Sequence, residues 1–278
     1  MPKVLLLGAN GQLGKALQKA LFSAFEVSAF TKDQLDITDF SALEKYLTEG
    51  KPDFVVNAAA YTNVDKAESE KELAQKINSE AVGTLAELCE KHDAKLIHFS
   101  TDYVFDGDDE NGYLEDADTN PINFYGETKL AGEQKIQASG CDFAIIRTSW
   151  LYGEGKNFVN TMLELTKKNT EIKVVSDQIG CPTYTKDLAK ATRDLMLDDK
   201  KGVFHLTNSG STNWADFARK IFELAQTQTK VIDIPTSEYP TPAKRPLNSV
   251  LLNTKLPQLR SWEEALEEFL KTTDQSAQ

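Results

Sequence analysis

Short apolar runs alternate along most of this chain with longer amphipathic segments, and this alternation restricts the fold more than any other feature. Each run is bounded by polar or turn-forming residues and precedes a helix-like stretch. The runs are Val4–Leu7, Val27–Phe30, Phe54–Val56, Leu96–Phe99 and Phe143–Ile146. Strands that are buried on both faces and joined by crossover helices produce this pattern. The sequence therefore predicts an α/β fold built on a doubly wound parallel sheet.

After about Val175 the rhythm changes, which indicates a second, smaller part of the chain. Strand-like Val203–Leu206 and Val231–Ile234 flank a helix that opens near Thr212. Prolines 235, 240, 242, 246 and 257 indicate irregular loops. An amphipathic helix is expected over Trp262–Leu270, and Asp39 is expected to cap an earlier helix. We predict a large Rossmann domain over residues 1–175 and a smaller α/β lobe over 176–278, with some elements of the lobe returning to the sheet.

Charge and cysteine usage restrict the partners and the compartment. The 278 residues include 31 Lys and Arg but 43 Asp and Glu, a formal net charge of −12. Nucleic acids and anionic membrane surfaces would repel this chain, so we expect neither as a partner. Cys89, Cys141 and Cys181 are far apart and odd in number, which is typical of a reducing compartment.

Three further observations concern targeting and metals. The first residues lack the layout of a signal peptide, and no apolar run approaches membrane-spanning length. The cysteines form no CxxC pair and the three histidines are scattered, so no zinc site is expected. We therefore expect a cytoplasmic protein without a metal centre or a membrane partner.

A glycine-rich segment, Gly8-Ala9-Asn10-Gly11-Gln12-Leu13-Gly14, lies where the first expected strand turns into the first helix. The pyrophosphate of a dinucleotide needs close backbone and free N–H groups at a helix N-terminus, and glycines allow both. Three glycines alone also fit an ordinary strand–helix turn. Their position at the first βα junction of an alternating chain favours a dinucleotide site.

The ends of the second and third expected strands add to this site. Asp36-Ile37 follows the second strand, where a carboxylate can accept the adenine amino group, although Asp36 also fits a loop residue before a helix. Asn57–Thr62 contains three consecutive alanines. Their small side chains leave room for a ribose and adenine, but a tightly packed helix would need them too.

Cofactor choice depends on the end of the second strand, where the adenosine ribose is expected. A carboxylate there binds the 2′-hydroxyl of NADH, whereas a cation favours the 2′-phosphate of NADPH. Thr31 and Lys32 occupy this place, and no acidic residue stands at the immediate strand end. Lys32 also fits a side chain that points into solvent, and its neighbour Asp33 fits a carboxylate that cancels part of its charge. We therefore expect either NADPH or NADH to work, with a modest preference for NADPH through Lys32.

The segment Tyr125-Gly126-Glu127-Thr128-Lys129 places a tyrosine four residues before a lysine, in a helix expected to begin near Asn123. Residues i and i+4 share a helical face, so Tyr125 and Lys129 project together. A free phenol has a pKa of about 10, and a neighbouring ammonium lowers that pKa toward neutrality. A surface tyrosine–lysine pair has the same spacing, so the interpretation depends on neighbouring residues.

The neighbouring residues are Ser100–Phe105, which follow the fourth expected strand. Functional residues of open parallel sheets gather at the carboxyl ends of the strands. The hydroxyl of Thr101 can there bind the same carbonyl oxygen that Tyr125 protonates, although Thr101 also fits the cap of a turn. Thr101, Tyr125 and Lys129 beside a dinucleotide site predict an enzyme that reduces a ketone.

These features together resemble the extended short-chain dehydrogenase/reductase superfamily. More narrowly, the segments GANGQLG, NAAAYTNVDKAE, STDYVFDG, NFYGETKLAGE, RTSWLYG and RPLNSVLL resemble the dTDP-4-dehydrorhamnose reductase family and span residues 8 to 252. The resemblance implies hydride reduction of the C4 ketone of dTDP-4-dehydro-6-deoxy-L-mannose, the last step of dTDP-L-rhamnose biosynthesis. The implied partner is a small-molecule nucleotide sugar.

The resemblance also implies roles for single residues. Tyr125 matches the proton donor, Lys129 the residue that holds the nicotinamide ribose, Thr101 a third catalytic residue, and Tyr103 a tyrosine that adjusts the pKa of proton transfer. Substrate contacts fall on Thr101, Asp102 and Trp150, although Trp150 fits core packing equally well. Cofactor contacts fall on Gly11, Gln12, Leu13, Asp36, Ile37, Ala60, Tyr61, Thr62 and Phe99, in addition to Gly8 and Gly14.

Some basic residues stay outside the predicted site. Lys244-Arg245 is the best cationic candidate for the pyrophosphate in the C-terminal lobe, and it equally fits a solvated pair. Arg147 fits a buried ion-pair partner. Some family members dimerise through a metal held by glutamates, one of them just after the third glycine. Here Lys15 follows Gly14, so we expect a monomer or a homodimer without that metal.

Two other functions stay open from the sequence. A nucleotide-sugar dehydratase or epimerase of the same superfamily is the nearest, but a dehydratase needs an Asp-Glu pair where this chain has Asp102-Tyr103. A non-catalytic regulatory subunit that resembles the β subunit of methionine adenosyltransferase is the other. The set Thr101, Tyr125 and Lys129 argues against it. The sequence leaves open the nucleotide, the C5 configuration of the sugar, the preference for NADH or NADPH, and the oligomeric state.

Overall fold

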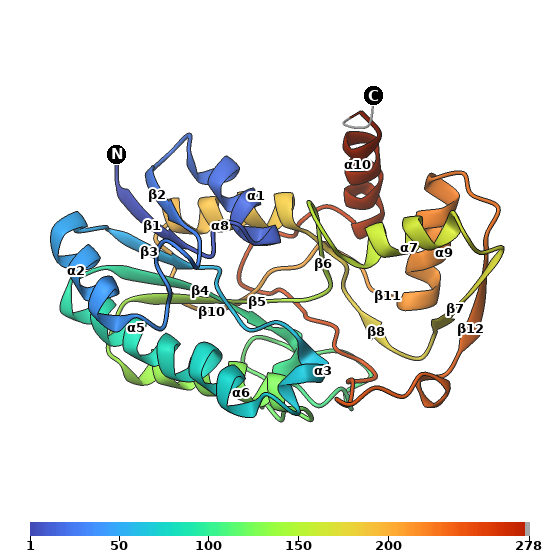
Figure 1. Cartoon of the computed structure of the whole chain (residues 1–278), viewed down its shortest axis with the longest axis horizontal. Coiled ribbons are helices and arrows are strands. Elements are labelled where there is room, and N and C mark those ends of the chain that lie inside the picture. Colours follow the sequence, from blue (N-terminus) through green and yellow to red (C-terminus); the bar gives the residue numbers. More distant parts are fainter. Residues whose placement is uncertain (276–278) are drawn as a thin grey trace.

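Six parallel strands form a large sheet in the order β10-β5-β4-β3-β1-β2. They are β1 (Lys3–Leu7), β2 (Glu26–Phe30), β3 (Phe54–Asn57), β4 (Lys95–Thr101), β5 (Phe143–Thr148) and β10 (Gly202–His205). All five apolar runs predicted as strands lie in this sheet, which confirms the doubly wound parallel fold (Figure 1). The chain order reverses between β1 and β3. Ligands of open α/β sheets bind outside the carboxyl ends of the strands at such a reversal.

Helices cover both faces of the sheet in this computed structural model, which describes residues 1–275. One face carries α1 (Gln12–Leu21) and α8 (Thr185–Leu197). The other carries α2 (Phe40–Gly50), α5 (Ala81–Lys91) and α6 (Phe124–Ala138). As predicted, Asp39 caps α2, since its side chain accepts the N–H of Ala42 at 3.0 Å.

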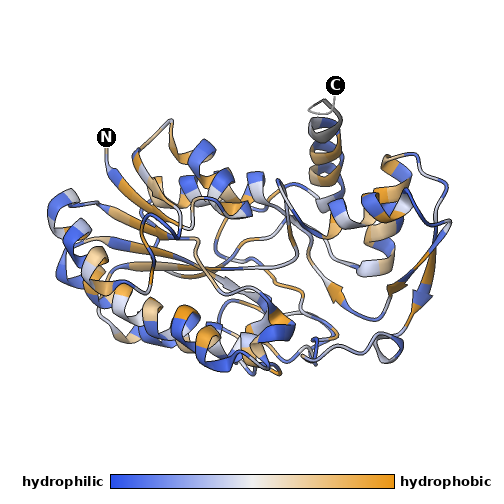
Figure 2. Cartoon of the chain, in the orientation of Figure 1, coloured by the Kyte–Doolittle hydropathy of each residue, from blue (hydrophilic) through white to orange (hydrophobic). Residues whose placement is uncertain are grey.

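Two hydrophobic cores fill the space between the sheet and these helices, one on each face. Successive residues of a strand point to opposite faces, so Val4 and Leu6 enter the core under α1 whereas Leu5 and Leu7 enter the core under α2. All four are buried, and each such side chain contributes about 1.5–3 kcal/mol relative to an exposed one. Figure 2 shows hydrophobic residues along the strands of this sheet.

Short helical segments connect β3 to α5 and follow β4. They are α3 (Val64–Ala67), α4 (Lys71–Gln75), the π-helix η1 (Lys76–Glu80) and the 3₁₀-helix η2 (Asp102–Val104). The π-helical turn runs directly into α5 and packs against α6. It places Asn78 inside the protein, fully buried, between the segment after β3 and helix α6.

A smaller lobe lies beside the carboxyl end of the sheet (Figure 1). Its elements are β6 (Leu151–Tyr152), α7 (Phe158–Thr166), β7 (Glu171–Val175), β8 (Ile179–Gly180), β9 (Thr183–Tyr184), β11 (Thr212–Asn213), α9 (Trp214–Leu224), β12 (Lys230–Ile234), η3 (Thr236–Glu238) and α10 (Trp262–Gln275). Strand β7 pairs with β12, β8 with β11, and β6 with β9. An aromatic core around Tyr152, Phe217, Trp262 and Phe269 holds the lobe together.

The chain passes between the two parts more than once. Several apolar residues within 151–175, including Tyr152 and Val174, bury their side chains in the smaller core. Residues 185–206 return to the large sheet as α8 and β10. The two parts are therefore built from alternating segments of the chain and do not meet at a single boundary. The assignment of cofactor binding to residues 1–175 and of substrate binding to residues 176–278 stays a prediction.

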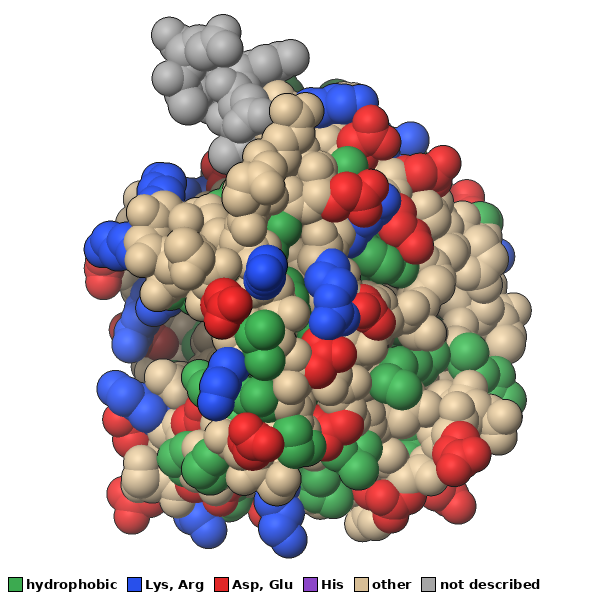
Figure 3. Space-filling model, turned by 90° about the vertical axis from the view of Figure 1, so that its right-hand side faces the viewer, with side chains coloured by type: hydrophobic (Ala, Val, Ile, Leu, Met, Phe, Trp, Pro, Cys, Tyr) green, Lys and Arg blue, Asp and Glu red, His purple; other side chains and the backbone are tan. Residues whose placement is uncertain are grey.

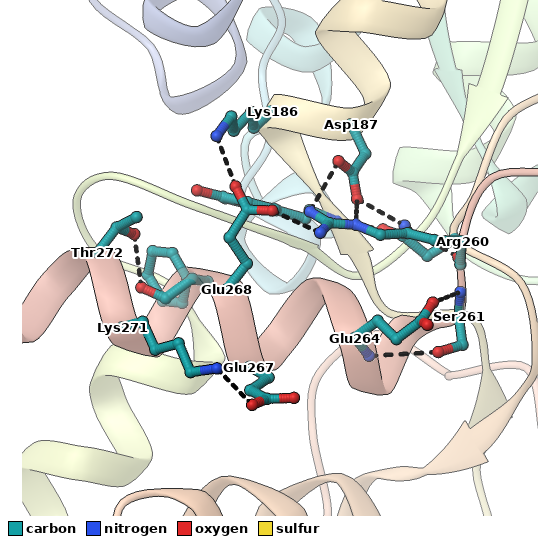
Figure 4. Close-up of polar contacts among 12 residues, drawn as sticks. Lys186, Asp187, Arg260, Ser261, Glu264, Glu267, Glu268, Lys271 and Thr272 are labelled. Atoms are coloured by element: carbon teal, nitrogen blue, oxygen red, sulfur yellow. Dashed lines mark hydrogen bonds and ion pairs between the residues drawn. The ribbon is translucent and has the colours of Figure 1, made fainter.

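Arg260 ties the last helix of the smaller lobe to the large sheet (Figure 4). Its Nε and Nη2 donate to the two carboxylate oxygens of Asp187 on α8, at 2.8 and 2.9 Å, while Nη1 donates to Glu268 on α10. Lys186 donates to the other oxygen of Glu268 at 2.5 Å. These charge-assisted bonds link α8, which packs on the sheet, to α10, which packs in the smaller core.

The surface on the side of the smaller lobe carries acidic and basic side chains interspersed with hydrophobic ones (Figure 3). Within residues 1–275, no helix is both long enough and apolar enough to cross a membrane.

Candidate active site

The glycine-rich segment joins β1 to the N-terminus of α1. Gly8 has a φ of +79°, and a Cβ on it would lie 2.7 Å from the carbonyl carbon of Ala58. A Cβ on Gly14 would lie 2.2 Å from the carbonyl oxygen of Gly8. These two glycines therefore let the turn, the helix and the end of β3 approach closely.

Helix α1 begins without a side-chain cap. Gly11 is its N-cap residue, so the N-cap position supplies no side chain to the N–H groups of the first turn, and that turn holds no acidic residue. Gln12 and Leu13 are the first helical residues. The free N–H groups and the positive end of the helix dipole suit a pyrophosphate. This segment therefore fits the dinucleotide predicted from the sequence.

The residues after β2 lie at the same edge. Oδ1 of Asp36 accepts hydrogen bonds from the backbone and the hydroxyl of Thr38, at 2.8 and 2.9 Å, and Oδ2 lies 3.9 Å from Nζ of Lys32. Burial opposes ionisation, but these hydrogen bonds and Lys32 lower the pKa of Asp36. Ile37 is buried. The carboxylate that pairs with Lys32 in the structure is thus Asp36, not Asp33.

The segment after β3 is held by Asn78 of the π-helical turn. Oδ1 of Asn78 accepts the N–H of Tyr61 at 2.9 Å, and Nδ2 donates to the Tyr61 carbonyl at 3.0 Å and to Thr128 on α6 at 3.1 Å. Ala60 is partly exposed and Thr62 exposed. Asn78 therefore fixes the predicted adenosine side of the site relative to the helix that carries Tyr125.

Helix α6 begins as the sequence predicts, with Asn123 as its cap. Oδ1 of Asn123 accepts the N–H of Gly126 at 2.8 Å. A Cβ on Gly126 would lie 2.1 Å from the carbonyl oxygen of Tyr103, so only glycine allows α6 to press so closely against η2. This close contact accompanies an edge-to-face packing of Tyr125 on Tyr103, with the two ring centres 6.0 Å apart.

Thr101 and Asp102 lie at the carboxyl end of β4, and both are buried. The Thr101 hydroxyl donates to Oδ1 of Asp102 at 2.9 Å. Burial raises the pKa of Asp102 to about 6, against the opposing effect of the Ser249 and Thr101 hydroxyls. Asp102 is therefore a buried acid that titrates close to neutrality beside Tyr125.

The sequence-based expectation that Lys129 lowers the pKa of Tyr125 is wrong for this arrangement. Burial raises the pKa of Tyr125, the charge of Asp102 raises it further, and only the hydroxyl of Thr101 opposes them. Burial and Asp102 likewise raise the pKa of Tyr103. Tyr125 is thus held as the protonated phenol, and the Thr101 hydroxyl is close enough to interact with it.

Lys129 points away from solvent into the interface of α6 with β4. It is 2% exposed, and its Nζ donates to the carbonyl of Phe99 at 2.7 Å. The same Nζ lies 3.2 Å from Nε2 of His98, and Nδ1 of His98 lies 3.1 Å from Nδ2 of Asn57 on β3. Burial lowers the pKa of Lys129 to about 8, although Glu133 opposes this change.

Arg147 is the buried ion-pair partner that its position suggested. Its Nη2 donates to Glu133 at 2.7 Å and its Nε to the same carboxylate at 3.0 Å, with both side chains at most 5% exposed. Arg147 lies on β5 and Glu133 on α6, one helical turn beyond Lys129. The pair fixes α6 against the sheet and lies outside the catalytic group itself.

Trp150 marks the junction of the sheet and the smaller lobe. It has a φ of +46°, a strained value for a non-glycine residue, and it stacks on Trp214 of α9 with ring centres 3.4 Å apart. Gly180 approaches the ring so closely that a Cβ there would lie 2.5 Å from it. The ring is only partly buried, so packing explains its position without excluding a contact with substrate.

Several residues that border this site lay outside the site predicted from the sequence. Arg245 is no solvated cation, because its Nη2 donates to Asp65 at 2.9 Å and its guanidinium lies 5.9 Å from the Tyr103 ring centre. Asn123 donates to the carbonyl of Lys244 at 2.9 Å. In the sequence, the segment that contains Arg245 was marked only by the family motif RPLNSVLL. Asn57 and His98 had no signal of their own beyond polarity within apolar segments, and Asn78, in the polar stretch 75–80, had none.

The arrangement can bind an anionic dinucleotide and donate a proton at the edge of β4. The open N-terminus of α1 follows β1, the segment held by Asn78 follows β3, and Thr101 ends β4, the three strands being neighbours in the sheet. A protonated phenol beside a hydroxyl suits a carbonyl oxygen that gains negative charge during reduction. The geometry therefore fits reduction of a ketone.

Comparison with known proteins identifies similar chains. The family described as the RmlD substrate binding domain matches residues 2–275. A dTDP-4-dehydrorhamnose reductase of Escherichia coli K12 is 44% identical over 271 residues, which cover 92% of this chain and 91% of that protein.

Solved structures agree with this similarity. A dTDP-4-dehydrorhamnose reductase of Clostridium acetobutylicum superposes with a TM-score of 0.95 at 43% identity, over 98% of this chain and 99% of that one. The dTDP-4-dehydrorhamnose reductase of Bacillus anthracis, solved in complex with NADP, superposes with a TM-score of 0.95 at 41% identity. It covers 98% of this chain and 100% of that one.

The buried pair of Arg147 and Glu133 predicts a large loss of stability in Glu133→Gln. This change leaves the guanidinium buried without a counter-charge, which costs about 3–5 kcal/mol. Thermal and denaturant unfolding measure the loss. Glu164→Gln breaks the exposed pair with Lys167 and serves as the control, with little change expected. Equal stabilities of the two variants would contradict a structural role for the buried pair.

Proposed function

Since this chain belongs to the RmlD family of dTDP-4-dehydrorhamnose reductases, we propose that it reduces the C4 ketone of dTDP-4-dehydro-6-deoxy-L-mannose to give dTDP-L-rhamnose. This would be the last step of dTDP-L-rhamnose biosynthesis, with NADPH or NADH as the reductant. The observation that carries the proposal is the contact of Thr101 with the protonated Tyr125, at the same edge of the sheet as the uncapped end of α1. A relative with this family name binds NADP in its solved structure.

The chemistry of the step divides between cofactor and protein. The reduced nicotinamide, when bound, supplies the hydride that the C4 carbon accepts. Tyr125 transfers its phenolic proton to the carbonyl oxygen, which becomes the new hydroxyl, and the phenolate then regains a proton from solvent. The Thr101 hydroxyl orients the same oxygen. The raised pKa of Tyr125 keeps the proton in place until negative charge develops on that oxygen.

The other site residues divide between the two ligands. Gly8, Gly11 and Gly14 with the first turn of α1 would hold the pyrophosphate, and Lys129 and Phe99 would lie at the nicotinamide ribose. Asp36, Ile37 and the segment 60–62 would border the adenosine.

On the sugar side, Asp102 and Trp150 would contact the substrate together with Thr101. Tyr103 would adjust proton transfer through its contact with Tyr125. The nucleotide sugar is the expected small-molecule partner, in a monomer or homodimer in the cytoplasm.

The test of this function is oxidation of NADPH with dTDP-4-dehydrorhamnose generated in situ, against matched UDP- and GDP-keto-sugars. We expect stoichiometric oxidation with the dTDP compound. Clear preference for a UDP- or GDP-sugar would overturn the substrate and leave a reductase. Turnover without net NADPH oxidation would point to an epimerase, and inactivity with a stoichiometric protein partner would point to a regulatory subunit.

Tyr125→Phe retains the ring and its packing against Tyr103 but removes the proton. We expect kcat to fall by about 10²–10⁴-fold, the usual contribution of a positioned general acid. The affinity for NADPH, measured by fluorescence titration, should change little, because the phenol does not hold the pyrophosphate. Near-normal turnover would show that another group donates the proton.

Lys32→Ala tests cofactor choice. Lys32 is exposed and shares its charge with Asp36, so its attraction for a 2′-phosphate is modest and screened by salt. We expect the wild type to use both cofactors, with a small preference for NADPH that shrinks at high salt. The variant should raise KM for NADPH and leave KM for NADH nearly unchanged. A strong wild-type preference for NADH, or an equal change for both cofactors, would refute the role of Lys32.

A further inference from the structure

A cavity of about 910 Å³ opens beside helices α1 and α8, which pack against each other on one face of the sheet (Figure 1). The turn Gly153–Gly155 after β6 and the side of α10 complete its wall. Neither Thr101 nor Tyr125 lines it, and of the described lining residues only Gln12 belongs to the predicted dinucleotide site. The volume lies within the range of about 300–1,000 Å³ that is usual for small-molecule sites.

Basic side chains dominate the wall of this cavity. They come from both helices, Lys15 and Lys19 from α1 and Lys186, Lys190 and Arg193 from α8. Within the part of the chain that the structure describes, Glu154 is the one carboxylate in the wall. The excess of positive charge is local, because the whole chain carries a formal charge of −12. A cleft lined by one sign of charge attracts small ions of the opposite sign.

Three of the five cations have partners on the protein. The pairs are Lys19 with Glu154, Lys186 with Glu268, and Arg193 with Asp194.

Lys15 and Lys190 differ from these three, because neither forms an ion pair within residues 1–275. The hydrogen bond from Lys19 lowers the pKa of Glu154, and the charge of Lys15 adds to this effect from a greater distance. Lys15 and Lys190 are both exposed. Two cations on neighbouring helices are thus free to meet an anion that enters the cavity.

The charges also indicate the kind of occupant. A second copy of the chain, seated on this face about a twofold axis, would bring the same patch against itself. The ammonium groups of Lys15 and Lys190 would then face those of the copy, and like charges repel. A chain of phosphate groups carries several negative charges and many acceptor oxygens, which match ammonium donors. A phosphorylated small molecule therefore fits this cavity better than a second copy.

Part of the wall is aromatic. Tyr184 and Phe269 line the cavity, and their rings pack edge to face with centres 5.5 Å apart. Small-molecule sites usually combine such rings with a few polar groups that orient the ligand. We propose that this cavity is a second binding site, for a small molecule that carries two or three phosphate groups, with Lys15 and Lys190 as its main contacts. The site goes beyond the proposed function, because none of its cations belongs to the reductase site.

The first experiment measures the binding of inorganic triphosphate and of ATP by isothermal titration calorimetry, in a metal-free buffer of low ionic strength. One equivalent of NADP⁺ is present to fill the dinucleotide site. We expect one triphosphate bound per chain, with an affinity that falls as salt is added. Tighter binding of ATP would assign the site to a nucleotide, and equal binding would assign it to the phosphate chain alone. The absence of binding at millimolar concentration, or binding that NADP⁺ abolishes, would refute the proposal.

The second experiment removes the two unpaired cations. Lys15→Gln and Lys190→Gln should each weaken triphosphate binding by about fivefold, and the double variant by about 20-fold or more. Lys45→Gln is the matched control, since Lys45 is exposed on α2, on the other face of the sheet. It removes the same charge and should change the affinity by less than about twofold. An equal loss in the control would show a general effect of net charge and would overturn the assignment.

Oligomeric state and activity complete the test. If sedimentation shows a dimer that the double variant strengthens, this face belongs to a second copy and the proposal is wrong. An active reductase that binds no triphosphate would refute this inference alone. An inactive protein that binds triphosphate as expected would refute the proposed function alone.

Discussion

Helix α6 buries two ionisable side chains, Lys129 and Glu133, on the face that packs against the sheet. The active site depends on the polar partner that each side chain finds there. Glu133 takes Arg147 from β5, whereas Lys129 takes the carbonyl of Phe99 and the ring of His98 from β4. Unpaired, either charge would cost several kcal/mol in this interface. The same contacts set the height and rotation of α6, and therefore the position of Tyr125 over the end of β4.

Much of this fold could be predicted from the sequence, because its signals are local. The five apolar runs are strands, Asp39 and Asn123 cap their helices, and Thr101 and Tyr125 meet at the edge of the sheet. Each prediction needed only a short window of residues and the rule that functional groups gather at the carboxyl ends of strands.

The rest depends on contacts between segments far apart in the chain. His98 within an apolar strand is indistinguishable from a core residue until Asn57 and Lys129 lie on its two sides. Burial and the nearby charge of Asp102 raise the pKa of Tyr125, and Lys129 donates to the carbonyl of Phe99 instead. None of these contacts is visible in the YxxxK spacing. Residues 151–175 continue the sequence of the large domain, but several of their apolar side chains, such as Tyr152 and Val159, lie in the core of the smaller lobe.

That aromatic core has a spectroscopic consequence. The chain contains three tryptophans, and Trp150, Trp214 and Trp262 all lie in or against the smaller lobe, while the large sheet and its helices contain none. Intrinsic tryptophan emission therefore monitors the lobe and its junction with the sheet, and melting of the nucleotide-binding sheet alone would leave that emission largely unchanged. The parallel stack of Trp150 on Trp214 also couples two indole transitions. Near-ultraviolet circular dichroism consequently carries a signature of the junction at which the two parts of the molecule meet.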